Sequence, residues 1–306
     1  MTSTLRIGSR RTPLALAQTH RVVSELTAAH PELVIEIVEI VSDGDVQPDV
    51  VLGPGVFVAA LRNAILDHRV DAAVHSLKDL PTAPLDGVVL AAVTEREDPR
   101  DVLVARDGLA LDELPRGARI GTSSPRRATT LIALDRGFEP VPVRGSVGRR
   151  LQRIDDGEVD ALVLARAGLV RLGLVDRITD TIDPGRMIPA AGQGALAVEC
   201  RSDDAATHDL LRSLDDLHAR AATDAERTLL AVLEAGCTHP VGAYAEVAEG
   251  DDGETELYLR AVVHASDGSD QVRLSTTGPL NDAQEVGRRL ALDLLAAGAD
   301  ALMERQ

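Results

Sequence analysis

The sequence predicts a layered α/β fold for the first two thirds of the chain and a smaller α+β domain beyond about residue 215. Two observations lead to this prediction. Short apolar runs alternate with helical patterns through the first two thirds, as expected when helices cover parallel or mixed sheets. After that, the pattern changes to one long helix, then strands, then a final helix.

The individual elements follow from apolar periodicity and from the turn residues between them. The expected strands are LRIGS, LVIEIVEIV, VDAAVHSL, VVLAAV, DVLVA, RIGTS, PVPV, VDALVLA and GALAVEC. The expected helices of this region span 13–29, 56–68, 125–136 and 147–155. In the last domain, a helix at about 217–234 precedes strands near 241–248, 256–264 and 271–277. The Gly/Pro/Asp-rich segment 43–55 is expected to form a long loop.

Length and composition limit the classes of function. A chain of 306 residues exceeds what one core usually organises, so two or three domains are expected. The net charge of −17 and the 1% of aromatic residues argue against nucleic acid as a main partner, because phosphate binding needs positive charge and single strands need stacking rings.

The sequence also lacks recognisable signals for secretion, membrane insertion and metal binding. The N-terminus MTSTLRIGSR lacks the apolar region of a signal peptide, and no stretch approaches 18 uninterrupted apolar residues. We therefore expect a cytoplasmic protein with no membrane partner. Two cysteines do not make a disulfide framework, and the eight histidines show no metal-binding motif, so no metal is expected.

Paired arginines accompany three expected helix starts. Thr12 with Pro13, and Ser124 with Pro125, are cap and first-position pairs, and Ser146 is the third expected cap. The arginines near these starts are Arg10, Arg11, Arg126, Arg127, Arg144, Arg149 and Arg150. An exposed cation in the first helical turn is disfavoured by about 0.3–1 kcal/mol, because the helix dipole is positive there.

An anionic ligand would account for this arrangement. Guanidinium groups beside free backbone N–H groups match carboxylates or phosphates, and three such sites indicate a polyanion. GxxxxGK[ST] is absent and GPG at 53–55 lacks the GxGxxG spacing, so carboxylates are favoured. The alternative is that the pairs are ordinary surface charges facing solvent or nearby Asp and Glu.

Cys237 and Asp79 are candidate reactive residues. Cys237 lies in EAGCTHPVGAY between a helix and a strand, where a thiolate could be a nucleophile or an attachment point, or the residue could be inert. Cys200, at the end of GALAVEC, is expected to be a small core residue. Asp79 follows an expected strand end, where open α/β sheets place functional groups. Lys78, the single lysine of the chain, could pair with a ligand carboxylate; the alternative is an exposed Lys-Asp turn.

Seven segments in order resemble the porphobilinogen deaminase (hydroxymethylbilane synthase) family and cover almost the whole chain. They are LRIGSRRTPLALAQ, VHSLKDLPT, GTSSPRRA, VRGSVGRRL, ARAGLVRLGL, PAAGQGALAVE and AGCTHPVGAY. The resemblance implies two periplasmic-binding-protein-like α/β lobes around a cleft and a smaller C-terminal α+β domain with the cofactor cysteine. The first lobe is expected at 1–95 and 195–212, the second at 100–190 and the last domain at 216–306.

The resemblance also implies the activity. Family members are transferases that condense four porphobilinogen molecules head to tail, with loss of ammonia, onto a dipyrromethane primer. They then release linear hydroxymethylbilane by hydrolysis. The primer is joined by a thioether to the cysteine that matches Cys237. The partner is therefore porphobilinogen, and a monomer is expected because the family is usually monomeric.

Roles for individual residues follow from the same resemblance. Each porphobilinogen carries an acetate and a propionate, so the primer and growing chain form a polycarboxylate that suits the arginine-flanked helix starts. Asp79 matches the catalytic aspartate, which stabilises positive charge as ammonia leaves and can relay a proton. The cofactor-binding positions are Cys237, Lys78, Arg126, Arg127, Thr122, Ser123, Ser124 and Arg144. The substrate-binding positions are Arg10, Arg150, Arg171 and Phe57.

Two departures from the family pattern stand out. Arg149 replaces the usual small residue and is left out of the site. The loop before the helix at 56–68 lacks the lysines that many members carry, although Phe57 keeps the family's loop phenylalanine.

Three other interpretations remain open. A carboxylate-binding receptor or transport component would not need Cys237. A cysteine-nucleophile acyl transferase would need a nearby base, for which His239 is the local candidate. An anion site used only for control would explain neither Cys237 nor Asp79.

Overall fold

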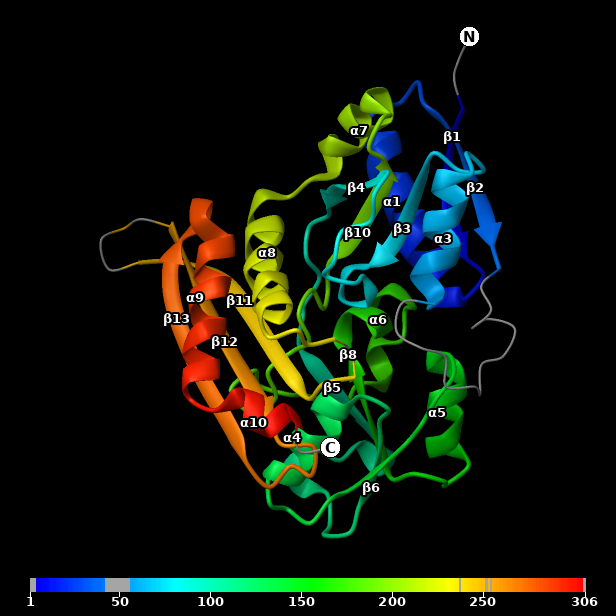
Figure 1. The fold of residues 1–306 in the computed structure, drawn as a ribbon. Helices are drawn as coiled ribbons and strands as arrows, with labels where there is room; N and C mark the ends of the chain where they lie inside the picture. Colours follow the sequence, from blue (N-terminus) through cyan, green and yellow to red (C-terminus); the bar gives the residue numbers. More distant parts are fainter. Residues whose placement is uncertain (1–3, 42–55, 237, 251–252, 254, 305–306) are drawn as a thin grey trace. The chain divides into compact units, whose positions relative to one another are not determined.

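The computed structural model describes residues 4–41, 56–236, 238–250, 253 and 255–304, and Figure 1 shows its ribbon. The chain divides into two compact units. The first unit comprises Met1–Glu97 and Gly194–Arg220, and the second comprises Asp98–Gln193 and Ala221–Gln306.

The first unit is built on a five-stranded mixed sheet in the order β2-β1-β3-β10-β4. Its strands are β1 (Thr4–Arg10), β2 (Val34–Ile40), β3 (Ala72–Ser76), β4 (Val88–Val93) and β10 (Leu196–Arg201). Strand β1 is parallel to β2 and β3, whereas β10 is antiparallel to β3 and β4. Because side chains alternate along β3, Val74 packs against α1 (Pro13–Ala29) and α7 (Ala205–Leu211) on one face. Ala73 packs against α3 (Val56–Leu66) on the other face.

The second unit contains another five-stranded sheet, in the order β7-β6-β8-β5-β9. Its strands are β5 (Asp101–Ala105), β6 (Arg119–Gly121), β7 (Glu139–Val141), β8 (Ala161–Ala165) and β9 (Asp180–Thr181). Helix α4 (Pro125–Ala133) packs on one face through Leu131, and α5 (Val147–Asp155) and α6 (Arg166–Arg171) pack on the other through Leu151 and Leu169.

The two five-stranded sheets share one topology. Strand for strand, β2-β1-β3-β10-β4 corresponds to β7-β6-β8-β5-β9, with the fourth strand antiparallel to both of its neighbours in each case. The helices that follow β1 and β6 both begin with proline, at Pro13 and Pro125. The expected pair of similar α/β lobes is therefore confirmed.

The smaller domain, which also lies in the second unit, has an antiparallel sheet. Its strands are β11 (Val241–Glu249), β12 (Thr255–His264) and β13 (Gln271–Pro279). Figure 1 shows α9 (Ala283–Ala296) lying along this sheet, and α8 (Leu217–Val232) and α10 (Ala299–Glu304) join the same apolar core. The expected α+β character of this region is confirmed.

Element boundaries depart from the sequence prediction in a few places. The helix expected at 125–136 ends at Ala133, because Asp135 and Gly137 adopt positive φ angles of 52° and 70° that cannot continue a right-handed helix. The short elements α6, α7 and β9 were not expected. The division into three domains at the expected boundaries stays a prediction.

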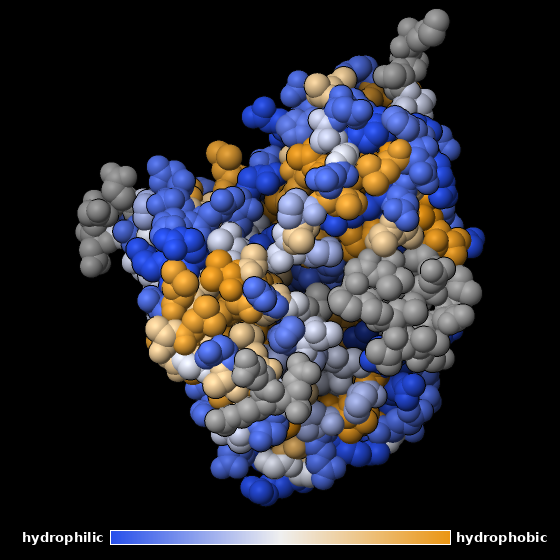
Figure 2. All heavy atoms as spheres, viewed as in Figure 1, coloured by the Kyte–Doolittle hydropathy of each residue, from blue (hydrophilic) through white to orange (hydrophobic). Residues whose placement is uncertain are grey.

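Hydrophilic side chains cover most of the face shown in Figure 2, as the net charge of −17 leads one to expect. An apolar patch lies over α9 in this view. Leu292, a residue of this helix, is among the exposed large apolar side chains of the described chain. In the described part of the chain, no helix combines the length and apolar character needed to cross a membrane.

Candidate functional site

The carboxyl edge of the first sheet brings three expected site residues together. Arg10 is the last residue of β1, and Lys78 and Asp79 lie in a short 3₁₀ turn directly after β3. Because β1 and β3 are parallel neighbours, both segments end at the same edge of the sheet. Asp79 is exposed, and Arg10 and Lys78 are half-buried. The arrangement places a carboxylate near cations where open α/β sheets bind ligands.

Apolar side chains hold the Lys78–Asp79 turn in place. Leu77 and Leu80, which flank it, are both buried in a cluster that includes Val58 of α3. The backbone N–H of Leu77 donates to the carbonyl of Ala195 at 3.1 Å, which ties the turn to the segment before β10. Burial of the two leucines therefore directs the intervening polar residues toward the edge of the sheet.

A polar layer under α1 was missed by sequence reasoning. The amide of Gln18 donates to the hydroxyl of Ser76 at 2.8 Å, and the Thr19 hydroxyl donates to that of Ser9 at the same distance. Gln18, Thr19 and Ser9 are all buried. Polar residues on a helix face that is otherwise apolar would have been the available signal.

Side chains cap two of the three helix starts as expected. The Thr12 hydroxyl accepts from the backbone N–H of Ala15 at 3.3 Å. The Ser146 hydroxyl accepts from the N–H of Arg149 at 3.5 Å. These caps set where α1 and α5 begin, and so where the nearby arginines lie.

The segment after β6 forms the corresponding edge of the second sheet. The N–H of buried Thr122 donates to the backbone carbonyl of Val141 at 2.8 Å. The hydroxyl of exposed Ser123 donates to the backbone carbonyl of Val143, also at 2.8 Å. Ser124 occupies the N-cap position, but among the described residues its side chain makes no capping hydrogen bond. Its N–H instead donates to the Thr122 hydroxyl at 3.2 Å, so the expected capping by the Ser124 side chain is wrong.

Three other arginines of the expected site lie on the second lobe. Exposed Arg144 follows β7 and directly precedes Gly145, whose φ of 100° turns the chain into α5. Arg150 is half-buried, and its Nε donates to the carbonyl of Gly145 at 2.8 Å. Arg171, also half-buried, ends the helix that follows β8. Since β6, β7 and β8 are parallel, all three arginines follow strands that end at one edge of this sheet.

Arg126 and Arg127 have a different environment. Both are buried, and both bind the carboxylate of Asp101, the first residue of β5. The contacts are 2.8 Å from Nη2 of Arg126 and 2.7 Å from Nη2 of Arg127. Arg126 also donates to the carbonyl of Ile188 at 2.6 Å, and the Gln193 amide donates to Asp101 at 2.8 Å. Within the described structure, an acidic side chain of the protein therefore meets the two first-turn cations of α4.

The charge state of Asp101 follows from this environment. Burial by itself would raise the pKa of Asp101, but the two guanidinium groups and the hydrogen bonds from Arg127 and Gln193 outweigh it and hold the pKa far below its usual range. Sequence reasoning missed Asp101 because it lies 25 residues before Arg126 and approaches it only through the pairing of β5 with β8.

The cysteine expected to carry the cofactor lies in a part of the chain that the structure does not describe. Cys237 lies outside the described residues, as does the loop 43–55; Phe57 is the second residue of α3, and its side chain is likewise not described. Two residues after Cys237 in the sequence, Nδ1 of His239 accepts from the N–H of Gly236 at 3.0 Å. A neutral imidazole that accepts at Nδ1 carries its proton on Nε2, so it is poorly set up as a general base. This geometry counts against the acyl-transferase interpretation.

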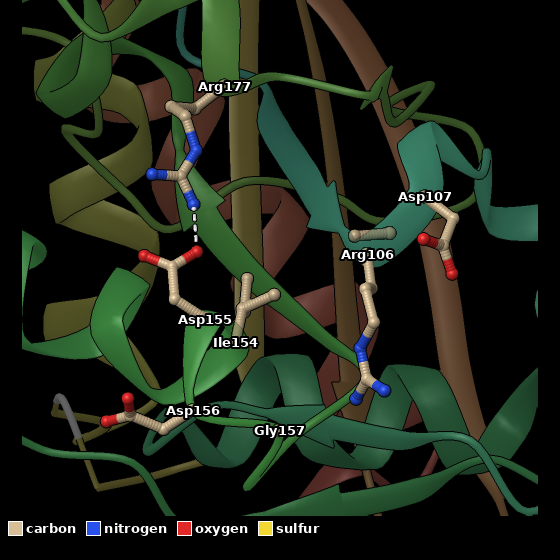
Figure 3. Close-up of a pocket in the computed structure, with 8 residues that line it drawn as sticks. Arg106, Asp107, Ile154, Asp155, Asp156, Gly157 and Arg177 are labelled. Atoms are coloured by element: carbon tan, nitrogen blue, oxygen red, sulfur yellow. Dashed lines mark hydrogen bonds and ion pairs between the residues drawn. The ribbon is translucent and has the colours of Figure 1, made fainter.

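A hollow of about 510 Å³ lies elsewhere on the second lobe. Figure 3 shows Arg177 pointing toward Asp155, and their ion pair measures 2.9 Å. The hollow includes Ala105, the last residue of antiparallel β5, which pairs with Ala161 at the amino end of β8. It therefore lies at the edge opposite to the one that carries Thr122 and Arg144.

Two α/β lobes of one topology, with cationic side chains at the carboxyl edge of each sheet, define the class as a two-lobed α/β protein with an added, smaller C-terminal domain. Residues 5–209 match the family model described as porphobilinogen deaminase, dipyromethane cofactor binding domain, and residues 221–296 match the porphobilinogen deaminase C-terminal domain. The chain belongs to the porphobilinogen deaminase family, whose members are enzymes of tetrapyrrole biosynthesis.

Named relatives agree with the family models. The porphobilinogen deaminase of Nocardia farcinica is 52% identical over 98% of this chain and 88% of its own length. Porphobilinogen deaminase 1 of Streptomyces coelicolor is 51% identical over 98% of this chain and 97% of its own length. A solved nutrient binding protein from Burkholderia cenocepacia, bound to methionine, overlaps with a TM-score of 0.44 at 13% identity, covering 68% of this chain and 89% of that one. So loose an overlap carries no conclusion about function.

Proposed function

We propose that this protein condenses four porphobilinogen molecules head to tail onto a dipyrromethane primer, with loss of ammonia, and then releases linear hydroxymethylbilane by hydrolysis. The observation that carries the proposal is the exposed Asp79 carboxylate, held beside Lys78 at the edge where β1 also ends in Arg10. Membership of the porphobilinogen deaminase family supports the same reaction.

Asp79 supplies the negative charge that the chemistry needs. Each addition breaks the C–N bond of an aminomethyl group, releases ammonia and forms a C–C bond as the attacking ring carbon loses its proton. An ionised carboxylate can accept the pyrrole N–H and stabilise the positive charge that develops as the amine leaves. The departing amine also needs a proton, which the same carboxyl group can relay.

The cationic residues hold the carboxylates of the substrate and the primer. We assign direct contacts to side chains at the carboxyl edges of the two sheets, because guanidinium and ammonium groups match acetate and propionate groups. These side chains are Arg10, Lys78, Arg144, Arg150 and Arg171, with hydroxyl groups from Thr122, Ser123 and Ser124. Arg126 and Arg127 stay in the proposal as cofactor-binding residues, and Asp101, which binds both guanidinium groups, fixes their position at the start of α4.

We further propose that the dipyrromethane is joined to Cys237 by a thioether. A thioether forms from a thiolate, and burial raises the pKa of the Cys200 thiol to about 11. Cys200 is fully buried, so of the two cysteines in the chain Cys237 is the candidate for attachment. When bound, the group supplies the ring carbon to which porphobilinogen is added. The donor set described above fits it, because its acetate and propionate groups are anionic.

The oligomeric state and location belong to the same proposal. We expect a monomer in the cytoplasm, as the family resemblance implies. Light scattering coupled to size exclusion should then give a mass near 32.4 kDa, whereas twice that value would contradict the monomer.

The intact mass of the purified protein, followed by peptide mapping around Cys237, tests the function. We expect an excess equal to two porphobilinogen units less two ammonia molecules, located on Cys237 and absent from Cys237→Ser. When porphobilinogen is added, the protein should consume the porphobilinogen and release ammonia, while the excess on Cys237 remains. A protein that stays unmodified after incubation with porphobilinogen, yet binds carboxylates, would instead be a receptor.

A further inference from the structure

A buried charged cluster lies beneath α3 in the first unit. The Arg62 guanidinium forms a bidentate contact with the Glu199 carboxylate: Nη2 donates to Oε1 at 2.7 Å and Nε donates to Oε2 at 3.0 Å. Nε2 of His75 lies 3.3 Å from Oε2 of the same carboxylate. The side chains of Arg62, Glu199 and His75 are 12%, 4% and 4% exposed. None of the three was assigned a role in the site.

The cluster joins three elements, one of which is β3, the strand that leads into the Lys78–Asp79 turn. Arg62 comes from α3, His75 from β3 and Glu199 from β10. Strands β3 and β10 are antiparallel neighbours, with Ala197 opposite His75. The pairing of β10 with β4 shifts in register at Glu199, an irregularity that can re-aim a side chain.

An apolar contact connects α3, which carries Arg62, to the Lys78–Asp79 turn. Val58 and Arg62 are four residues apart on α3 and so share one face of the helix. Val58 packs in the cluster that contains Leu77 and Leu80, on either side of Lys78–Asp79. His75 leads into this turn through β3, since it lies four residues before Asp79. One face of α3 thus contacts both the turn and the buried charges.

The energetics argue that the cluster does more than stabilise the fold. Burial alone would raise the pKa of Glu199, but His75 and Arg62 outweigh burial and hold it at about 2, so the carboxylate is ionised. Well-packed apolar side chains of similar size are often as stabilising as a buried ion pair. The bidentate contact between Arg62 and Glu199 additionally fixes the distance and orientation of α3 relative to β10.

We propose that Arg62, Glu199 and His75 are positioning residues that act through Asp79. They hold α3 and the end of β3 in one arrangement, so that the Lys78–Asp79 turn keeps a single orientation toward the substrate. This inference rests on the proposed function of Asp79. It extends that function to a cluster that does not itself meet the substrate.

The test replaces the charges by apolar side chains in Arg62→Met/Glu199→Leu. We expect primer attachment and the thermal unfolding midpoint to stay close to wild type, while kcat falls by about 10-fold or more and KM changes less, because small misplacements of reacting groups are costly. In an Asp79→Asn background the same double substitution should cause little further loss of kcat, because the cluster acts through Asp79.

A matched control lies at the other end of the same sheet. Arg6 Nη2 contacts Asp71 Oδ1 at 2.8 Å just before β3 begins, so Arg6→Met/Asp71→Asn removes an ion pair far from the turn along the strand. We expect wild-type kcat for this control. If the Arg62→Met/Glu199→Leu variant folds poorly, Arg62→Lys is measured instead. It keeps the positive charge but loses the bidentate contact with Glu199, so it should still lower kcat.

Three results would overturn the inference: wild-type kcat in Arg62→Met/Glu199→Leu or Arg62→Lys, an equal loss in the Arg6/Asp71 control, or full additivity with Asp79→Asn. A wild-type protein that neither carries the primer nor consumes porphobilinogen would contradict the proposed function itself, and the inference would fall with it. The two failures are therefore distinguished by the wild-type measurement.

Discussion

Nη2 of Arg126 lies 2.8 Å from Oδ2 of Asp101, and both side chains are almost completely buried. This contact connects the first turn of α4 to the first residue of β5, and Arg127 binds the same carboxylate from the next position. A carboxylate shared by two guanidinium groups offsets the cost of placing cations at a helix start, where the dipole is unfavourable to them.

Asp101→Asn should therefore destabilise the protein. Removing the charge leaves two buried guanidinium groups without a counter-ion, and we expect a loss of about 3–5 kcal/mol in the free energy of unfolding. Urea unfolding followed by circular dichroism measures it. The control is Asp112→Asn at the exposed Arg186 pair, where solvent screens the charges and the loss should be much smaller. Equal effects of the two substitutions would contradict this account of Asp101.

Asp79→Asn should keep the primer and lose turnover. The substitution preserves the shape of the side chain but removes the charge that stabilises the departing amine, so we expect kcat to fall by roughly 100-fold or more. Intact mass should still show the excess on Cys237. Asp86→Asn, an exposed position before β4, serves as the control and should behave as wild type. Near-normal turnover in Asp79→Asn would exclude the catalytic assignment.

His264 should make the stability of the second unit depend on pH. It is fully buried with Nε2 3.2 Å from the Thr130 hydroxyl, and burial, with Arg273 and Arg126, lowers its pKa to about 4. The unfolded value is about 6.5. Because the folded pKa is depressed, the contribution of neutral His264 is complete above pH 6.5 and is lost as the pH falls toward 4.

Urea unfolding of wild type and His264→Gln at pH 7 and pH 5 isolates this contribution. From the two pKa values we expect wild type to lose about 2 kcal/mol more than the variant over this interval. For each protein, the free energy of unfolding at pH 5 is subtracted from that at pH 7. Comparing these two differences removes any effect of the substitution on packing that does not depend on pH. If both proteins lose the same amount, His264 is not the group responsible.

Cys200 should resist thiol reagents in the folded protein. The residue is fully buried, and burial raises the pKa of its thiol to about 11, so little reactive thiolate is present at neutral pH. Native, primer-loaded protein should gain no label from iodoacetamide, and protein unfolded in guanidinium should gain one, on Cys200. Labelling of Cys200 under native conditions would show that the site opens more readily than its burial indicates.

Local sequence signals predicted the elements well where a physical rule acts over a few residues. Pro13 and Pro125 start helices as expected, and the apolar runs form the expected strands. The polar turn at Lys78–Asp79 follows β3 as its position in the sequence indicated. Short elements such as α6 were missed, because six residues give too little periodicity to recognise.

Side-chain partnerships were much less predictable. Ser124 and Thr12 look alike as caps in the sequence, yet Thr12 caps with its side chain, whereas the Ser124 N–H donates to Thr122 instead. The sequence showed Arg126 and Arg127 in a first helical turn and suggested a ligand for them. The structure supplies Asp101 from an antiparallel strand.

The sequence by itself determined the alternation of helices and strands, the cationic helix starts, the Lys78–Asp79 turn and, through its ordered motifs, the family. Tertiary structure alone decided the order of the strands within the two lobes, the pairing of Asp101 with two arginines and the Arg62–Glu199–His75 cluster. The reason is the range of the forces involved. Helix propensity, capping and strand alternation depend on neighbouring residues, whereas the partner of a buried charge depends on which distant segments strand pairing brings together.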